Sequence, residues 1–399
     1  MRALTMEPLK AGAVSVREVP DPVPGEGELL VRGLAVGVCG TDREIIAGDY
    51  GWAPPGRELL VLGHESLGRV VSAPDGSGFA PGDLVAGVVR RPDPEPCGAC
   101  ARGQFDMCRN GKYTERGIKE IDGFASELWT VEADYAVAVD AGLESVGMLI
   151  EPASVLAKAW DQIERVGGRS WFEPKRLLVT GAGPIGLLGA LMGVQRGLDV
   201  HVVDLATDGP KPAAVAALGA TYHSEPAAEV ATALGADVVI EATGVGQVVF
   251  DAMRHTAAYG IVCLTGVSTG GHSIGVDAGA VNREIVLEND VVIGTVNANV
   301  GHYEAAAKSL LAADLDWLEG LITRRVPLDD FAEALEARPV DVKVVLTLEL
   351  AGVGLRRGTP RPPAARGSPR RSRRGSPAAR RARRARRPRG GKARRPARR

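Results

Sequence analysis

The chain has 399 residues, of which 45% are apolar and 24% charged. These are values of an ordinary globular protein rather than a disordered one. The net charge of −1 hides an uneven distribution, because residues 351–399 hold 19 Arg, one Lys and no acid, so 28 of the 48 basic residues and all 49 acidic residues lie in residues 1–350.

Two further features concern location. The first residues lack the apolar core of a signal peptide, and five cysteines do not form the pattern of a secreted disulfide framework. The long uncharged run 177–195 contains several glycines and Pro184, so we expect a strand, a loop and a helix there rather than a membrane span. The sequence therefore predicts a cytoplasmic protein without membrane contact.

The N-terminal part alternates short β-like runs with Gly/Pro turns. Runs at 28–32, 67–71 and 81–85 are examples, and they predict a β-rich domain over residues 1–155. Residues 154–166 have helical spacing and are expected to link this domain to the next one.

From Lys175 the pattern changes to strands alternating with helices. We expect a helix ending at Gln195, a second helix at 212–218, and strands at 176–180, 200–204, 237–241, 260–265 and 291–294. This alternation predicts a doubly wound parallel sheet, which we assign to residues 156–295. A helix at 304–312 and a strand at 342–348 are expected to return to the first domain over residues 296–350.

Residues 351–399 consist almost entirely of Arg, Pro, Ala, Gly and Ser. They have no periodic apolar face and cannot bury enough surface to offset their ordering entropy, so we predict disorder. One interpretation is an arm that binds nucleic acid or another acidic partner, with strongly salt-dependent affinity. The other, which we favour, is a nonfunctional extension or a shifted reading frame in a GC-rich gene.

A dinucleotide-binding pattern follows the strand at 176–180. It reads Gly181-Ala182-Gly183-Pro184-Ile185-Gly186 and opens a helix. The first glycine permits the tight turn, the second lets the backbone approach a pyrophosphate, and the third allows close helix–strand packing. Asp204 lies 23 residues after Gly181, where a carboxylate accepts hydrogen bonds from ribose hydroxyls. We therefore expect NAD to be favoured over NADP, because a 2′-phosphate would meet this carboxylate.

A set of metal-binding residue types precedes that pattern. Cys39, His64, Glu65 and Glu151 supply a thiolate, an imidazole and two carboxylates. A catalytic zinc keeps three protein ligands and an open position, so Cys39, His64 and one of the two glutamates would suffice. Such a zinc lowers the pKa of a bound hydroxyl, and Thr41 is placed to accept its proton. Together with a nicotinamide coenzyme, this set predicts hydride transfer from an alcohol carbon.

A second cluster consists of Cys97, Cys100 and Cys108. Three clustered cysteines in a cytoplasmic chain suggest a structural zinc, for which Asp93 or Glu95 would supply the fourth ligand. We favour Asp93, and a loop that has lost its metal is the alternative. Cys263 lies in a strand pattern and is expected to be a core residue.

Taken together, these motifs resemble the zinc-containing medium-chain alcohol dehydrogenases over residues 1–350. The resemblance implies an α/β fold class with a GroES-like β-rich catalytic domain and a Rossmann doubly wound parallel sheet domain. Members of that family carry four cysteines in the second zinc loop, and Pro94 stands where the first of them would be.

The resemblance is closer to the glucose dehydrogenase branch. It rests on the stretches 110–120, 122–125, 150–155 and 207–212, with Glu151 where the liver-type enzymes carry Cys. By this resemblance Glu115 and Asn297 would contact sugar hydroxyls, together with Thr41 and Glu151. The branch oxidises an aldose at C1 to the lactone with NAD or NADP and tends to form tetramers.

The sequence therefore predicts a zinc-dependent glucose or aldose 1-dehydrogenase, with Thr41 and Glu65 as catalytic residues and a homotetrameric assembly. A polyol or threonine dehydrogenase of the same family is the alternative enzyme. Two other hypotheses stay open: nucleic-acid binding through the basic tail, and a catalytically inactive structural relative.

Overall fold

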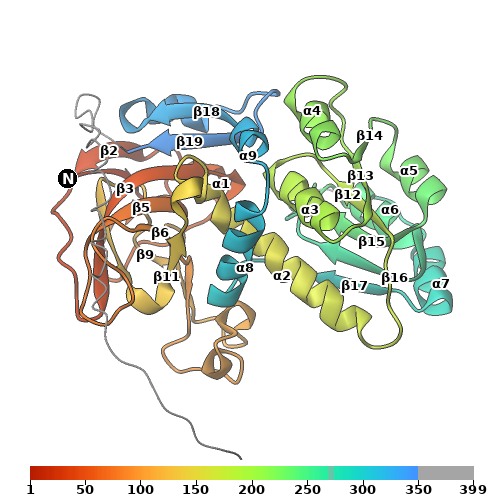
Figure 1. Ribbon diagram of the computed structural model, residues 1–399, viewed down its shortest axis with the longest axis horizontal. Helices are drawn as coiled ribbons and strands as arrows, with labels where there is room; N and C mark the ends of the chain where they lie inside the picture. Colours follow the sequence, from red (N-terminus) through yellow and green to blue (C-terminus); the bar gives the residue numbers. More distant parts are fainter. Residues whose placement is uncertain (269, 271–272, 349–399) are drawn as a thin grey trace, which may run out of the picture. The chain divides into compact units, whose positions relative to one another are not determined.

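The structure is a computed structural model that describes residues 1–268, 270 and 273–348. It contains a β-rich part, drawn in red, orange and blue in Figure 1, and an α/β part drawn mainly in green and cyan. The expected α/β fold class with these two kinds of domain is confirmed. The predictions of disorder and nucleic-acid contact for the tail fall on 351–399 and lie outside the described residues.

The β-rich part is built around one seven-stranded sheet. Its order is β11-β6-β5-β3-β19-β18, and β10 also pairs with β3. The strands are β3 (Glu28–Val38), β5 (Glu65–Ser72), β6 (Leu84–Gly87), β10 (Leu128–Glu132), β11 (Ala136–Val139), β18 (Ile322–Pro327) and β19 (Lys343–Thr347).

The β-rich part also contains two three-stranded sheets, whose strands precede or interrupt those of the large sheet in the chain. The first has the order β2-β1-β4, with β1 (Arg2–Met6), β2 (Val14–Glu18) and β4 (Leu60–Val61). The second has the order β7-β8-β9, with β7 (Arg90–Arg91), β8 (Thr114–Arg116) and β9 (Glu120–Ile121). A short helix, α1 (Gly40–Ala47), begins directly after β3, so the residue between them lies at a strand-to-helix turn.

The α/β part has a six-stranded parallel sheet in the order β14-β13-β12-β15-β16-β17. Its strands are β12 (Arg176–Thr180), β13 (Asp199–Val203), β14 (Thr221–His223), β15 (Ala236–Glu241), β16 (Thr256–Leu264) and β17 (Val291–Gly294). The connecting helices are α3 (Pro184–Gln195), α4 (Pro210–Ala217), α5 (Ala227–Leu234), α6 (Gly246–Arg254) and α7 (Ala278–Glu288).

Helices cover both faces of this sheet because the side chains of its strand β12 point alternately to the two faces. Leu177 and Val179 belong to the core cluster that contains the α3 residues Leu187 and Leu188. Leu178, between them, belongs to a separate cluster with Val230 of α5 and Ala252 of α6. Successive residues of a strand face opposite sides, so a continuous apolar run is buried on both.

Four helices complete the fold: α2 (Ile150–Gly167), α8 (Val300–Leu311), α9 (Leu315–Leu321) and α10 (Phe331–Leu335). Helix α8 packs along α2. The closing strand β19 then pairs antiparallel with β3, with Val345 opposite Gly37. The last described strand therefore shares a sheet with a strand from the N-terminal region. This pairing brings Lys343 beside the turn after β3.

Two further observations concern single predictions. Cys263 lies in β16 with 0% of its surface exposed, which is the core position expected for it. Among the described residues, no helix has both the length and the apolar character needed to cross a membrane.

Candidate active site

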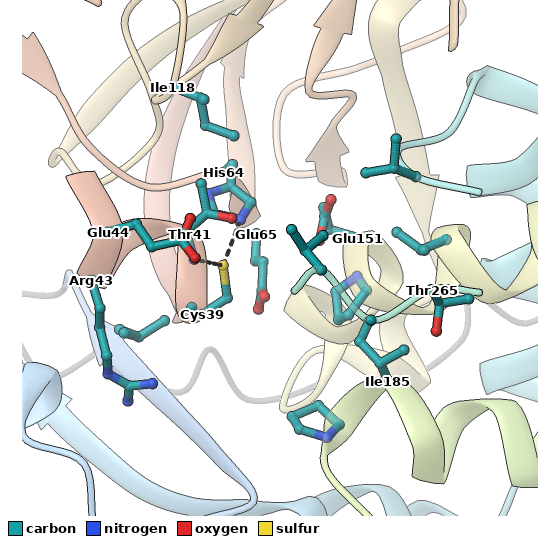
Figure 2. Close-up of a pocket in the computed structure, with 18 of the residues that line it drawn as sticks. Cys39, Thr41, Arg43, Glu44, His64, Glu65, Ile118, Glu151, Ile185 and Thr265 are labelled. Atoms are coloured by element: carbon teal, nitrogen blue, oxygen red, sulfur yellow. Dashed lines mark hydrogen bonds between the residues drawn. The ribbon is translucent and has the colours of Figure 1, made fainter. Parts of the chain in front are cut away.

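One large cleft, with a volume of about 1020 Å³, lies where the β-rich and α/β parts meet. Nine residues singled out from the sequence line it: Cys39, Thr41, His64, Glu65, Glu115, Glu151, Pro184, Ile185 and Asn297. Among the described residues, Asp204 and the Cys97, Cys100 and Cys108 cluster are not part of its wall. Figure 2 shows Cys39, Thr41, His64 and Glu65 on one side, facing Glu151, Ile185 and Thr265.

The turn between β3 and α1 holds Cys39 as the N-cap of the helix. Its sulfur accepts a hydrogen bond from the backbone N–H of Thr41 at 3.3 Å and lies 3.1 Å from His64 Nε2. His64 directly precedes β5, the neighbour of β3 in the sheet. The pairing of two adjacent strands therefore brings the thiol and the imidazole together, although they are 25 residues apart in the chain.

Asp42 supports both of these side chains. Its Oδ2 accepts the backbone N–H of Cys39 at 2.9 Å, and its Oδ1 lies 3.5 Å from His64 Nδ1. Burial opposes a charged imidazole, but the neighbouring Cys39 and Asp42 raise the pKa of His64 well above its usual value. A carboxylate on the outer ring nitrogen is the arrangement that orients metal-binding histidines.

The buried side chain of Lys343 holds the Glu65 carboxylate in place. Glu65 and Lys343 are each 2% exposed and form an ion pair, and Lys343 Nζ also donates to the carbonyl of Val38 at 3.1 Å. Gly37 makes room for this pair, because a Cβ there would meet the Glu65 carboxylate and the Lys343 side chain within 3 Å. The lysine fixes the carboxylate beside Cys39 and His64.

Glu151 stands in the first turn of α2 and lines the opposite wall. Burial raises the pKa of its carboxyl to about 7, with His64 favouring the charged form and Glu65 opposing it. Its carboxylate is not part of the tight group formed by Cys39, His64 and Glu65, whose ligand atoms all lie within 4.8 Å of one another.

The donor set fits a zinc ion. A sulfur, an imidazole nitrogen and a carboxylate converge at the cleft wall, which matches the three protein ligands and open position of catalytic zinc. The buried atoms His64 Nδ1 and Asp42 Oδ1 lie 3.5 Å apart and make no hydrogen bond within the described part of the chain.

The three glycines of the 181–186 loop differ in conformation and in the space around them. Gly181 has φ +92°, a conformation that favours glycine, and a Cβ on Gly186 would lie 1.8 Å from the carbonyl oxygen of Gly181. A Cβ on Gly183, the N-cap of α3, would meet nothing within 4 Å. Pro184 occupies the first helical position, where its missing N–H costs nothing. The loop thus presents open backbone at a helix N-terminus, a site suited to phosphate.

Asp204 follows β13 and already has three partners. Its carboxylate accepts the backbone N–H groups of Ala182 at 2.7 Å and Ala206 at 3.1 Å, and Lys211 Nζ lies 3.2 Å from both oxygens. Burial would raise the pKa of Asp204, but these two N–H groups and Lys211 hold it below its usual value. Asp204 is therefore an ionised group next to the glycine loop, with a cation at its side.

Glu115 and Asn297 meet on the cleft wall. Asn297 Nδ2 donates to Glu115 Oε1 at 2.7 Å, and Arg90 Nη2 donates to the same oxygen at 2.9 Å. Asn297 has φ +61°, a left-handed conformation that asparagine tolerates better than most residues. Within the described part of the chain, Glu115 Oε2 makes no hydrogen bond, which leaves it free to bind a ligand hydroxyl.

The second cysteine cluster forms a compact lobe away from the cleft. The sulfurs of Cys97, Cys100 and Cys108 lie within 4.8 Å of one another, whereas the carboxylate of Asp93 is outside that group. Asp93 Oδ1 accepts the N–H of Glu95 at 2.8 Å, and its Oδ2 is buried without a hydrogen-bond partner among the described residues. The backbone N–H of Arg109 lowers the pKa of Cys97 to about 6, which favours the thiolate that metals bind.

Sequence reasoning missed three residues that shape the site: Asp42, Arg90 and Lys343. Asp42 stands three residues after Cys39, the spacing of a capping box, which was a usable signal. Lys343 is the single charge in the apolar run 342–348, and this also pointed to a buried partner. Nothing in the sequence marked Arg90.

Comparisons with known proteins agree with this arrangement. A family described as "Alcohol dehydrogenase GroES-like domain" matches residues 25–141, and one described as "Glucose dehydrogenase C-terminus" matches residues 144–348. The glucose 1-dehydrogenase of Methanocella arvoryzae is 39% identical over 87% of this chain and 99% of its own length. That of Thermoproteus tenax is also 39% identical, over 88% of this chain and 100% of its own length.

Solved structures give the same result. Haloferax mediterranei glucose dehydrogenase in complex with NADP, Zn and gluconolactone superposes with a TM-score of 0.81 at 33% identity. The match covers 88% of this chain and 100% of that one.

Proposed function

Because the chain belongs to the zinc-containing medium-chain alcohol dehydrogenase family, in its glucose dehydrogenase branch, we propose that it oxidises glucose or a related aldose at C1 with NAD or NADP, giving the aldonolactone. One observation carries this proposal. The Cys39, His64 and Glu65 group and the Pro184 and Ile185 end of the glycine loop face the same cleft. A substrate hydroxyl and a nicotinamide can therefore meet there.

The chain's own residues have separate tasks in this reaction. Cys39 and His64 would hold zinc, with Glu65 or Glu151 as the third ligand; bound zinc would polarise the C1 hydroxyl, and the nicotinamide would accept the hydride. Asp42, 3.5 Å from His64 Nδ1, would orient the imidazole so that Nε2 faces Cys39 and the metal. The Thr41 hydroxyl, at the cleft wall beside Cys39, would take the proton of the sugar hydroxyl and pass its own proton on to solvent.

Glu115 and Asn297 are the residues that would bind the sugar hydroxyls. A carboxylate and an amide bind a vicinal pair of hydroxyls and lose affinity for an analogue that lacks one of them. The Arg90 contacts fix Glu115 Oε1, so the remaining oxygen is oriented before the substrate arrives. Glu151 is the additional sugar contact that we propose on the opposite wall.

For the coenzyme we propose that NAD is favoured and NADP accepted. The Asp204 carboxylate would accept hydrogen bonds from the ribose hydroxyls and repel a 2′-phosphate, whereas Lys211, 3.2 Å away, would offer that phosphate a cation. The relative structure from Haloferax mediterranei contains NADP, which supports the second half of this proposal.

Replacing Lys211 by alanine is expected to lower kcat/KM with NADP by about tenfold or more, the effect of losing one charge-assisted contact to phosphate. The value with NAD should change by less than about threefold, because Asp204 keeps its two backbone donors. Initial rates at saturating glucose with each coenzyme measure the ratio. Equal losses with the two coenzymes would contradict the assignment of Lys211.

Three further proposals complete this account. We propose that Cys97, Cys100 and Cys108 hold a second, structural zinc, with Asp93 as the fourth ligand. We also propose that the folded chain is divided into a catalytic domain (1–155), a coenzyme-binding domain (156–295) and a segment that returns to the catalytic domain (296–350). We also propose a cytoplasmic homotetramer, for which light scattering of the purified protein gives the mass.

The function is tested by following NADH and NADPH formation with glucose, galactose, xylose and sorbitol, before and after treatment with a chelator. We expect glucose oxidation that the chelator abolishes and that added zinc restores. Activity with sorbitol but not with glucose would move the assignment to a polyol dehydrogenase. A folded, zinc-loaded protein that oxidises none of the sugars would overturn the proposal.

A further inference from the structure

A ring of buried polar contacts lies directly behind the sugar-facing wall of the cleft. Its front members, Arg90, Glu115, Val296 and Asn297, line the cleft, whereas Asp106 and Lys158 do not. Asp106 belongs to the lobe that carries the three cysteines, between Cys100 and Cys108. Lys158 lies in α2. The ring therefore joins the cysteine lobe to the residues proposed to bind sugar.

Asp106 contacts three other residues of this ring or beside it. Its carboxylate pairs with Lys158 Nζ at 2.9 Å and accepts a hydrogen bond from Asn299 Nδ2 at 2.9 Å. Its backbone carbonyl accepts from Arg90 Nη1 at 3.1 Å. The side chains of Asp106 and Lys158 are each only 1% exposed, so neither charge has water as an alternative partner.

Two paths lead from Asp106 to the sugar wall. Through Arg90, the path continues to Glu115 Oε1 at 2.9 Å. On the second path, Lys158 Nζ donates to the carbonyl of Val296 at 2.9 Å. The next residue, Asn297, donates from Nδ2 to Glu115 Oε1 at 2.7 Å. Asp106 thus holds the guanidinium behind Glu115 through its backbone carbonyl, and the backbone that presents Asn297 through its carboxylate and Lys158.

Removing the charge of Asp106 would leave Lys158 buried without a counter-ion. A buried unpaired charge is costly, so the lysine would lose its proton or move, and its bond to Val296 would weaken. The burial of Lys158 already lowers the pKa of its ammonium, although Asp106 favours the charged form. The expected consequence is displacement of Val296 and Asn297, not of the coenzyme loop.

We propose that Asp106 is a positioning residue for the sugar site, and that the cysteine lobe serves glucose binding by holding Asp106 against Arg90 and Lys158. The inference rests on the proposed function, since it assumes that Glu115 and Asn297 contact the sugar. It assigns a role in substrate affinity to a lobe that lies outside the cleft.

The test compares Asp106→Asn with the wild-type enzyme. The substitution keeps the shape of the side chain and removes its charge. We expect KM for glucose to rise about tenfold or more, since small displacements of binding groups are costly. We expect kcat and KM for the coenzyme to stay within about twofold, because interactions made equally in the ground and transition states change KM alone. Lys158→Met, which removes the other half of the ion pair, should shift glucose KM in the same direction.

Two controls separate the possible failures. Glu164→Gln removes an exposed carboxylate from the same helix as Lys158, paired with Arg196 and outside the ring, and should leave all three constants unchanged. Glu115→Gln tests the sugar contact itself. If Glu115→Gln raises glucose KM and a folded Asp106→Asn does not, the positioning role is wrong while the function stands. If the wild-type enzyme does not oxidise glucose, the proposed function fails first.

If Asp106→Asn does not fold, Lys158→Met decides the question by the same measurements. A rise in coenzyme KM as large as the rise in glucose KM would show a general structural defect, and so would a fall in kcat by the same factor. Either result would overturn the inference.

Discussion

Replacement of Cys39 by serine should abolish turnover, with kcat/KM for glucose falling by at least about 10³-fold. Cys39 is the one thiol of the group that faces the cleft, 3.1 Å from His64 Nε2. A hydroxyl is a poor zinc ligand beside a thiolate, and a metal that polarises the reacting oxygen supplies several kcal/mol of transition-state stabilisation. The zinc content of the purified variant should fall by one ion per chain relative to the wild-type protein.

The matched control is Cys263→Ala. Cys263 is fully buried in β16 and lines no part of the cleft, so the variant should lose some stability but keep its zinc and its kcat. Steady-state kinetics and metal analysis of both variants measure the effect. A Cys39→Ser protein that retains full zinc and wild-type turnover would remove Cys39 from the proposed metal site.

The second large effect is expected for Gly186→Ala. A Cβ at this position would lie 1.8 Å from the backbone oxygen of Gly181, and backbone cannot rotate away as a side chain can. Overpacking of this kind costs about 3 kcal/mol or more of folding free energy. The glycine loop or helix α3 must also shift, so coenzyme affinity should fall by at least about tenfold. Urea denaturation and coenzyme titration measure the two effects.

Gly183→Ala is the comparison that separates stability from binding. Its Cβ would enter open space, so the free energy of unfolding should change by no more than about 1 kcal/mol, the cost of a poorer helix cap. Coenzyme affinity should still fall, because the methyl group stands where the backbone must approach the pyrophosphate. Wild-type coenzyme affinity in Gly183→Ala would show that the phosphates lie elsewhere.

The sequence by itself determined the class of fold and the chemical character of the site. Continuous apolar runs such as 176–180 and the glycine pattern after them depend on local rules, namely strand burial on both faces and the steric needs of a phosphate-binding turn. The observed strands β12 and β17 agree with the expected ranges 176–180 and 291–294. The residue types of Cys39, His64 and Glu65 likewise indicated a metal before any distance was known.

Only the tertiary structure decided which groups stand behind those residues. Lys343 reaches Glu65 because β19 returns to pair with β3, and Asp106 reaches Lys158 because the cysteine lobe packs against α2. These partners are 278 and 52 residues apart, respectively. Such contacts depend on strand order and helix packing rather than on sequence spacing. The sequence could therefore name most candidate ligands, but not the buried charges that orient them.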